Sequence, residues 1–195
     1  MVGRKGETGK NSGAIWGDKE PIFDGRSSLL SDELSSYAVC TTKTYFDKVF
    51  GVECLNKVPF SVDNATADSG YTPINTVVLN KIVVIKLGIK PDDYGAKVAY
   101  QFAHELTHVV FKAYFGINKP YAGEDEEMIC TASALTVVKN IYPNELYRFI
   151  KTASSSDNIG YQNGVPLADA ISYDMEKIKD LILWFPMKLQ YQNNS

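Results

Sequence analysis

The chain contains two histidines, His104 and His108, which lie four positions apart with Glu105 directly after the first. If residues 101–111 (QFAHELTHVVF) form a helix, both imidazoles lie on one face, one above the other. Two imidazoles in this arrangement can bind one metal ion, and the His-Glu-x-x-His pattern is typical of catalytic zinc. Glu105 is offset around the helix, so we predict that its carboxylate reaches a zinc-bound water instead of the metal. Zinc lowers the pKa of such a water to about 7, and the carboxylate takes its proton as the water attacks a carbonyl.

A catalytic zinc ion usually has three protein ligands and a water, so one protein ligand is still to be found. The candidates lie in an acidic run and the cysteine after it: Glu124, Asp125, Glu126, Glu127 and Cys130. We predict Glu127, because it lies seven residues before Ala134, in line with the strongest apolar stripe of that helix. That stripe comprises Ala134, Val137, Val138 and Ile141. Cys130 and Thr131 are small and are expected to pack behind the site. Glu126 is the alternative ligand, since an error of one residue in the helix phase would favour it.

Helices are predicted around the histidines and after them. The helix that carries the histidines starts near residues 91–93 and runs to about Tyr114, with Gly116 as its stop signal. Its apolar positions recur at helical spacing, at Ala99, Phe102, Ala103, Leu106, Val110 and Ala113. The acidic helix covers residues 124–140, and shorter helices follow near 143–153 and 167–184, the last ending before Pro186. The segment SSSDNIGYQNG between these two helices is predicted to be a loop.

The first half of the chain supplies one more helix and a few strands. Residues 27–50 are predicted to be helical, with Ser31 as the N-cap and Gly51 just past the end. The predicted buried stripe of this helix is Leu34, Ala38, Tyr45 and Val49. Strands are predicted at residues 58–62 and 75–80. Residues 82–87 either extend the second strand or form a separate short element.

Composition limits the class of protein. The 195 residues, 45% of them hydrophobic, are enough for one substantial core. We expect a flexible leader at residues 1–26, rich in Gly, Ser, Lys and Asn, and a single domain at 27–195. A net charge of −3 without a basic stripe argues against nucleic-acid binding, and no apolar run is long enough to span a bilayer. The leader lacks the apolar segment of a secretory signal, and three cysteines without a CxxC spacing are typical of reduced thiols. A cytoplasmic location is therefore expected, with export by a route that needs no such signal as the alternative.

Residues 58–140 resemble the gluzincin type of His-Glu-x-x-His zinc metallopeptidases. The resemblance rests on HELTH followed by EDEEMICTASA. The preceding GYTPINTVVLN and AYQFAHELTH are similar to compact prokaryotic members, including the ImmA/IrrE-like group. Where that group has a Leu-Leu-Met-Pro stretch after its glutamate helix, this chain has TVVKNIYP. Eighteen residues lie between His108 and Glu127, close to the gluzincin spacing, which also favours Glu127 as the third ligand.

The resemblance implies an α+β, zincin-like fold. A small sheet would pack on the long His-Glu-x-x-His helix, followed by the glutamate-bearing helix and further C-terminal helices. It also implies a Zn²⁺ cofactor bound by His104, His108 and Glu127, and a peptide or protein substrate lying along an edge strand at 75–80. Other gluzincins often stabilise the oxyanion with a histidine or tyrosine. No histidine remains, so the open candidates are Tyr114, Tyr121, Tyr147, Tyr161 and Tyr173.

The function predicted from these features is zinc-dependent hydrolysis of peptide bonds, with Glu105 activating the water. The alternative is a catalytically inactive, zincin-like binding or regulatory module that holds a protein partner along its edge strand. A third class, a structural protein without a metal, requires the His-Glu-x-x-His pattern to be accidental. Metal analysis separates the third class from the other two, and proteolysis with and without a chelator separates the first from the second.

Overall fold

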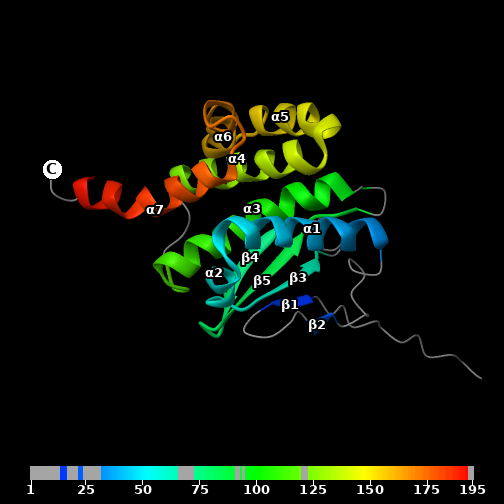
Figure 1. The fold of residues 1–195 in the computed structure, drawn as a ribbon, viewed down its shortest axis with the longest axis horizontal. Coiled ribbons are helices and arrows are strands. Elements are labelled where there is room, and N and C mark those ends of the chain that lie inside the picture. The colour runs from blue at the N-terminus through cyan, green and yellow to red at the C-terminus, as the bar shows by residue number, and fades with distance from the viewer. Residues whose placement is uncertain are drawn as a thin grey trace, which may run out of the picture.

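The computed structural model describes residues 14–16, 22–23, 32–65, 73–90, 93, 95–119 and 123–192. The described residues form an α+β fold, in which a small mixed sheet is covered on one face by helices and further helices stack beyond them (Figure 1). The α+β class expected from the sequence is therefore confirmed. Among the described helices, none combines the length and the apolar character needed to cross a membrane.

The sheet has the strand order β2-β1-β3-β5-β4 within the described residues. The strands are β1 (Ala14–Trp16), β2 (Ile22–Phe23), β3 (Phe60–Asn64), β4 (Ile74–Val78) and β5 (Ile82–Leu87). β3 and β5 pair in parallel, whereas the other pairs are antiparallel. Residues 82–87 are thus a strand of their own, and β4 lies at one edge of the sheet. Alternate side chains of β5 are buried, as expected for a strand with one face covered by helices.

The segment 1–26, expected to be a flexible leader, contributes β1 and β2 to the sheet. β1 pairs with β3, and β2 pairs with β1. A short strand needs only an open edge to pair with, so such a strand can form within a segment whose composition is typical of a leader. The remaining residues of the predicted leader lie outside the described part of the chain.

The first helix, α1 (Glu33–Phe50), begins after a different cap from the predicted one. Asp32 is the N-cap, and its carboxylate accepts a hydrogen bond from the backbone N–H of Ser35 at 2.7 Å. The predicted cap, Ser31, lies outside the described residues. A short helix, α2 (Val52–Asn56), follows directly after Gly51, which has a φ of +83°. Gly51 therefore ends α1 as predicted.

The buried face of α1 differs from the prediction at one position. Ala38 and Val49 are buried and Tyr45 is partly buried, but Leu34 is 62% exposed. Ser35 is buried in its place. The buried face is thus rotated by one residue in the first turn of the helix, which turns Leu34 toward solvent.

The helix that carries both histidines is α3 (Gly95–Phe115), which lies between the sheet and α4 and beside α1 (Figure 1). It begins later than the predicted start at 91–93, since Asp93 lies before the helix in a turn, where its backbone N–H donates to the carbonyl of Lys90 at 2.9 Å. It ends as predicted before Gly116, whose φ of +96° suits glycine. The predicted apolar positions Ala99, Phe102, Ala103, Leu106 and Val110 are buried, and Ala113 packs partly buried against them.

The acidic helix is α4 (Glu124–Ile141), which matches the predicted 124–140 and packs on α3. Four acidic residues in its first turn complement the helix dipole. A 3₁₀ turn, η2 (Pro143–Glu145), then leads into α5 (Leu146–Ser154), where a helix over 143–153 was predicted. α5 and α6 lie beyond α4, on the side away from the sheet (Figure 1).

The C-terminal part of the chain differs most from the prediction. The predicted loop at 154–164 contains the first half of α6 (Ile159–Ala170), and the predicted helix at 167–184 is divided between α6 and α7 (Met175–Gln192). Asn158 caps α6, since its side-chain oxygen accepts a hydrogen bond from the backbone N–H of Gly160 at 2.8 Å. Ser172 and Tyr173 both have positive φ, which interrupts the helix between α6 and α7. α7 also continues past Pro186, whereas the helix was predicted to end at about residue 184, before this proline.

Two glycines allow α6 to lie close against α4. A Cβ added at Gly160 would be 2.5 Å from Cβ of Glu127, and one added at Gly164 would be 2.5 Å from Cβ of Thr131. Neither distance is possible for a larger residue without moving one of the helices. Both glycines belong to the segment predicted to be a loop, and in the structure they are contact residues of a helix pair. As a result, α6 packs directly on the turn of α4 that carries Glu127.

Candidate functional site

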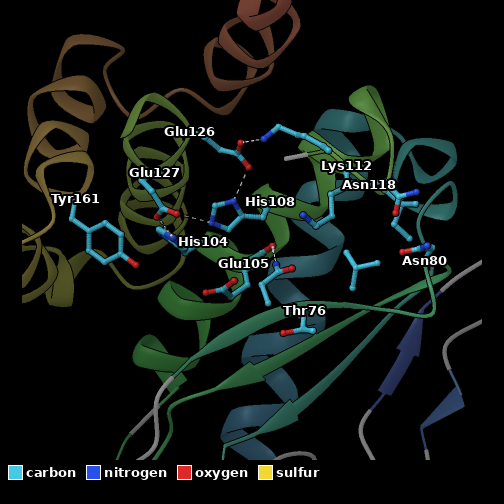
Figure 2. Close-up of a pocket in the computed structure, with 14 residues that line it drawn as sticks. Thr76, Asn80, His104, Glu105, His108, Lys112, Asn118, Glu126, Glu127 and Tyr161 are labelled. Atoms are coloured by element: carbon cyan, nitrogen blue, oxygen red, sulfur yellow. Dashed lines mark hydrogen bonds and ion pairs between the residues drawn. The ribbon is translucent and has the colours of Figure 1, made fainter. Parts of the chain in front are cut away.

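A cleft of about 670 Å³ lies beside the two histidines, bounded by α3, α4, α6 and the edge strand β4 (Figure 2). It is lined by Asn75, Thr76, Val77, Asn80, His104, Glu105, His108, Lys112, Ile117, Asn118, Lys119, Glu126, Glu127 and Tyr161. The four residues predicted for catalysis and metal binding all belong to this lining. The fold thus brings together the histidine helix, the acidic helix and the edge strand around one space.

The carboxylate of Glu127 faces both histidine rings. Its Oε2 is 3.1 Å from Nε2 of His104, and its Oε1 is 3.5 Å from Nε2 of His108. The two rings stand edge to face, with their centroids 5.1 Å apart. Two ligand atoms bound at about 2.0–2.1 Å to a tetrahedral zinc ion are about 3.3 Å from each other. The distance from each Nε2 atom to its nearest oxygen of Glu127 is close to this value, and the two distances involve different oxygens of the carboxylate.

Glu126 lies on the other side of the His108 ring. Its Oε1 is 2.9 Å from Nδ1 of His108, and its Oε2 accepts a hydrogen bond from Nζ of Lys119. Its side chain is only 2% exposed, whereas that of Glu127 is 20% exposed toward the cleft. Histidines that bind metals usually have such a partner on the second ring nitrogen, which fixes the ring and its tautomer. In this geometry Glu126 holds the His108 ring at Nδ1, whereas Glu127 lies near Nε2.

The electrostatics of the cluster keep both carboxylates ionised. Burial alone would raise the pKa of Glu126, but its hydrogen bonds with His108 and Lys119 outweigh this and lower it. The pKa of Glu127 is lowered in the same way, against burial, by its hydrogen bond with His104. Burial alone would lower the pKa of His108, but Glu126 and the other nearby carboxylates raise it. An ionised carboxylate is the form that binds a metal ion.

Cys130 offers a second possible set of ligands. His104, His108 and Cys130 each present one ligand atom, and these atoms lie within 4.8 Å of one another. However, the sulfur of Cys130 is close to Nδ1 of His108, at 3.4 Å, and this nitrogen already has Glu126 as its partner. Burial and the neighbouring carboxylates also raise the pKa of the Cys130 thiol well above its ordinary value. A metal held by Cys130 and this nitrogen would thus separate His108 from Glu126, whose buried charge would lose a partner.

Glu105 lines the same cleft, one residue after the first histidine, and is held from the sheet side. Nδ2 of Asn75 on β4 donates a hydrogen bond to the backbone carbonyl of Glu105 at 3.1 Å. Oδ1 of Asn75 is buried and has no hydrogen-bond partner within the described residues. The carboxylate of Glu105 points into the cleft, apart from the three ligand candidates (Figure 2). This position suits a group that acts on a water or substrate in the cleft.

Tyr161 reaches the cleft from α6, on the side of His104 (Figure 2). Its ring stands edge to face against the His104 ring, with the centroids 5.0 Å apart. Burial, together with the charges of Glu127 and Glu105, raises the pKa of Tyr161, so its hydroxyl stays a hydrogen-bond donor at neutral pH. Of the five tyrosines left open by the sequence, Tyr114, Tyr147 and Tyr173 are not in the lining, and Tyr121 lies outside the described residues.

Some residues of the cleft were not identified from the sequence. Lys112 follows His108 by four positions, so the same helical spacing that linked the histidines would have placed it on their face. Lys119 and Asn75 reach the site from a loop and from a strand edge, and no local signal marks such positions. Tyr161 was a candidate only by residue type, because the helix that carries it was predicted to be a loop.

A scan against protein-family models, a search of curated proteins and a search of solved structures each found no match to this chain.

Proposed function

We propose that this protein is a zinc-dependent metallopeptidase of the gluzincin type, with His104, His108 and Glu127 as its metal ligands. The observation that carries the proposal is the placement of one carboxylate opposite two Nε2 atoms at 3.1 and 3.5 Å. The presence of Glu105 in the same cleft supports a hydrolytic role in addition to metal binding. Zinc bound there would polarise a substrate carbonyl and lower the pKa of a water ligand to about 7.

Glu105 is the general base of the proposed reaction. It takes a proton from the attacking water and passes that proton to the amine that leaves when the peptide bond breaks. Its carboxylate forms no hydrogen bond or ion pair with another side chain among the described residues, so it is available to the water. The hydrogen bond from Asn75 to the Glu105 backbone holds this turn of α3 against β4.

The substrate is proposed to be an extended peptide that adds to the sheet at β4. Among the described strands, β4 pairs only with β5, which leaves its other edge open for backbone hydrogen bonds. Asn75, Thr76 and Val77 of this strand line the cleft directly opposite the histidine helix. A peptide on this edge would carry its scissile carbonyl past the metal position.

Tyr161 is the proposed donor to the oxyanion that develops on the scissile carbonyl. Replacing it with phenylalanine is expected to lower kcat by about 10²-fold, because one preorganised hydrogen bond to the transition state is lost. KM and the zinc content should change little, since the ring and its contact with His104 remain. Steady-state kinetics on a cleaved peptide provide the measurement. Tyr147→Phe is the matched control, because Tyr147 is 78% exposed on α5 and outside the cleft. An unchanged kcat in Tyr161→Phe would assign the oxyanion to another donor.

The function itself is tested by metal analysis combined with proteolysis. The purified protein is expected to contain about one zinc ion per chain and to cleave members of a randomised peptide library. A chelator should abolish cleavage and added zinc should restore it, because the metal supplies the activated water. Protein without any transition metal, even after zinc is supplied, would contradict the proposal. Zinc-loaded protein that retains peptides without cleaving them would favour the inactive binding module.

A further inference from the structure

The end of the cleft beyond His108 carries a positive charge that the proposed reaction does not use. Lys112 follows His108 by one helical turn on α3 and lies near Asn118 and Asn80 in the cleft, on the side opposite Tyr161 (Figure 2). Its side chain is half-buried. Among the described residues, no carboxylate forms an ion pair with Lys112, although Glu126 and Glu127 line the same cleft. A partly buried cation without a counter-ion is costly, and the pKa of Lys112 is accordingly lowered by burial.

The nearby carboxylates are already engaged by other groups. Glu126 is bound by His108 and Lys119, and Glu127 faces His104 and His108. Lys119 cannot take the place of Lys112, because its ammonium group is bound to Glu126 and lies 5.5 Å from the centre of the Phe111 ring. The remaining lining at this end is neutral: Val77, Asn80, Ile117 and Asn118. The ammonium group of Lys112 therefore has no ion-pair partner among the described residues and can bind an anionic group in the cleft.

We infer that Lys112 is a specificity residue that binds a carboxylate of the peptide substrate, beside the residues that flank the scissile bond. This inference rests on the proposed peptidase function. A peptide along β4 that passes the metal position also passes Lys112, since the cleft lining continues from Val77 in β4 to Asn80 in the turn between β4 and β5. A substrate carboxylate at Lys112 would supply the missing counter-ion, while Asn80 and Asn118 offer side-chain amides to its oxygens. The carboxylate is either an Asp or Glu side chain or the C-terminus of the peptide.

The test uses the zinc-loaded, full-length protein and a randomised decapeptide library in two forms, with a free C-terminal carboxylate and with a C-terminal amide. Cleavage products are sequenced by mass spectrometry. The wild type is expected to prefer a carboxylate roughly 10- to 100-fold over its amide counterpart, the range for a charged hydrogen bond in a partly buried site. Enrichment of Asp and Glu over Asn and Gln at one flanking position would identify a side chain as the source. Preference for the free-acid library alone would identify the C-terminus.

Three variants separate recognition from folding. Lys112→Met should abolish the preference, and Lys112→Arg should retain most of it, because arginine keeps the charge. Lys139→Met, a control on the exposed part of α4, should behave as the wild type. Zinc content and circular dichroism are measured for each variant. An equal preference in Lys112→Met and the wild type, or no preference in the wild type, would overturn the inference while leaving the peptidase function intact.

A binding measurement keeps the inference testable if the protein does not cleave peptides. Fluorescence anisotropy of a labelled Glu-rich decapeptide and its Gln-rich counterpart is compared for the zinc-loaded wild type and Lys112→Met. Tighter binding of the Glu-rich peptide that disappears in Lys112→Met would support the carboxylate site although the hydrolytic function had failed. Equal binding of both peptides to the wild type would refute the site.

Discussion

Replacing Glu105 with glutamine is expected to lower the rate of peptide hydrolysis by at least about 10²-fold while leaving zinc bound. Glutamine has nearly the same size as glutamate, but its amide cannot take a proton from the attacking water. The carboxylate of Glu105 points into the cleft apart from Glu127, whose oxygens face the histidine nitrogens. The zinc site should therefore be unaffected by the substitution. Peptide cleavage rates and zinc stoichiometry, measured on the same preparation, provide the test.

Glu124→Gln is the matched control for this experiment. Glu124 is an exposed acid in the first turn of α4 and is not part of the cleft lining. The Glu124→Gln substitution removes one negative charge without changing a group that acts on the water. The rate of peptide hydrolysis by this variant should therefore stay close to that of the wild type. A Glu105→Gln variant that loses zinc together with activity would show that Glu105 is itself a ligand. A variant that retains full activity would remove Glu105 from the mechanism.

The histidine helix could be predicted from the sequence because its signals are local and agree with each other. Apolar residues recur at helical spacing from Ala99 onward, and Gly116 stops the helix where the pattern ends. The position of Glu127 also followed from helix phase. An apolar stripe defines which face of α4 meets its neighbour, and Glu127 continues that stripe by two helical turns.

The wall of the cleft that α6 forms could not be predicted from local sequence signals. Gly160 and Gly164 read as loop residues because glycine lowers helix propensity, yet tertiary packing decides their state. Both lie in α6, and α4 lies so close to them that no side chain fits at either position. The close packing of α6 on α4 depends on residues of α4, far away in the sequence. Without this packing, Tyr161 could not be placed beside His104. The same limit applies to Asn75, whose bond to the Glu105 carbonyl joins residues thirty positions apart.

The contact between Glu126 and His108 distinguishes the two neighbouring glutamates, which sequence spacing alone does not. Sequence spacing treats Glu126 and Glu127 as competitors for one metal position. In the structure they occupy different positions around the same imidazole, one at Nδ1 and one near Nε2. Losing either should therefore weaken metal binding, but to different degrees. A carboxylate that orients a ligand typically contributes about 10- to 100-fold in metal affinity.

Glu127→Ala is accordingly expected to weaken zinc binding by more than the roughly 10- to 100-fold expected for Glu126→Ala. The first variant removes a ligand from the ion, whereas the second leaves three ligands and loosens one of them. Activity should fall together with zinc occupancy in Glu127→Ala and should recover at saturating zinc in Glu126→Ala. Competition titration with a chromophoric zinc chelator measures both affinities, and peptide cleavage over a range of free zinc measures recovery.

Cys130→Ser completes this comparison, because the thiol is the other group that could take the third position. With Glu127 as the ligand, Cys130→Ser should bind zinc nearly as tightly as the wild type, since the sulfur only packs beside Nδ1 of His108. Protein loaded with cobalt should then also lack the ultraviolet absorption of a cobalt–thiolate bond. A large loss of zinc in Cys130→Ser with little loss in Glu127→Ala would reverse the assignment. The metal would then lie on the Nδ1 side of His108, where binding must displace Glu126 from its buried position and leave the negative charge of Glu126 to Lys119 alone.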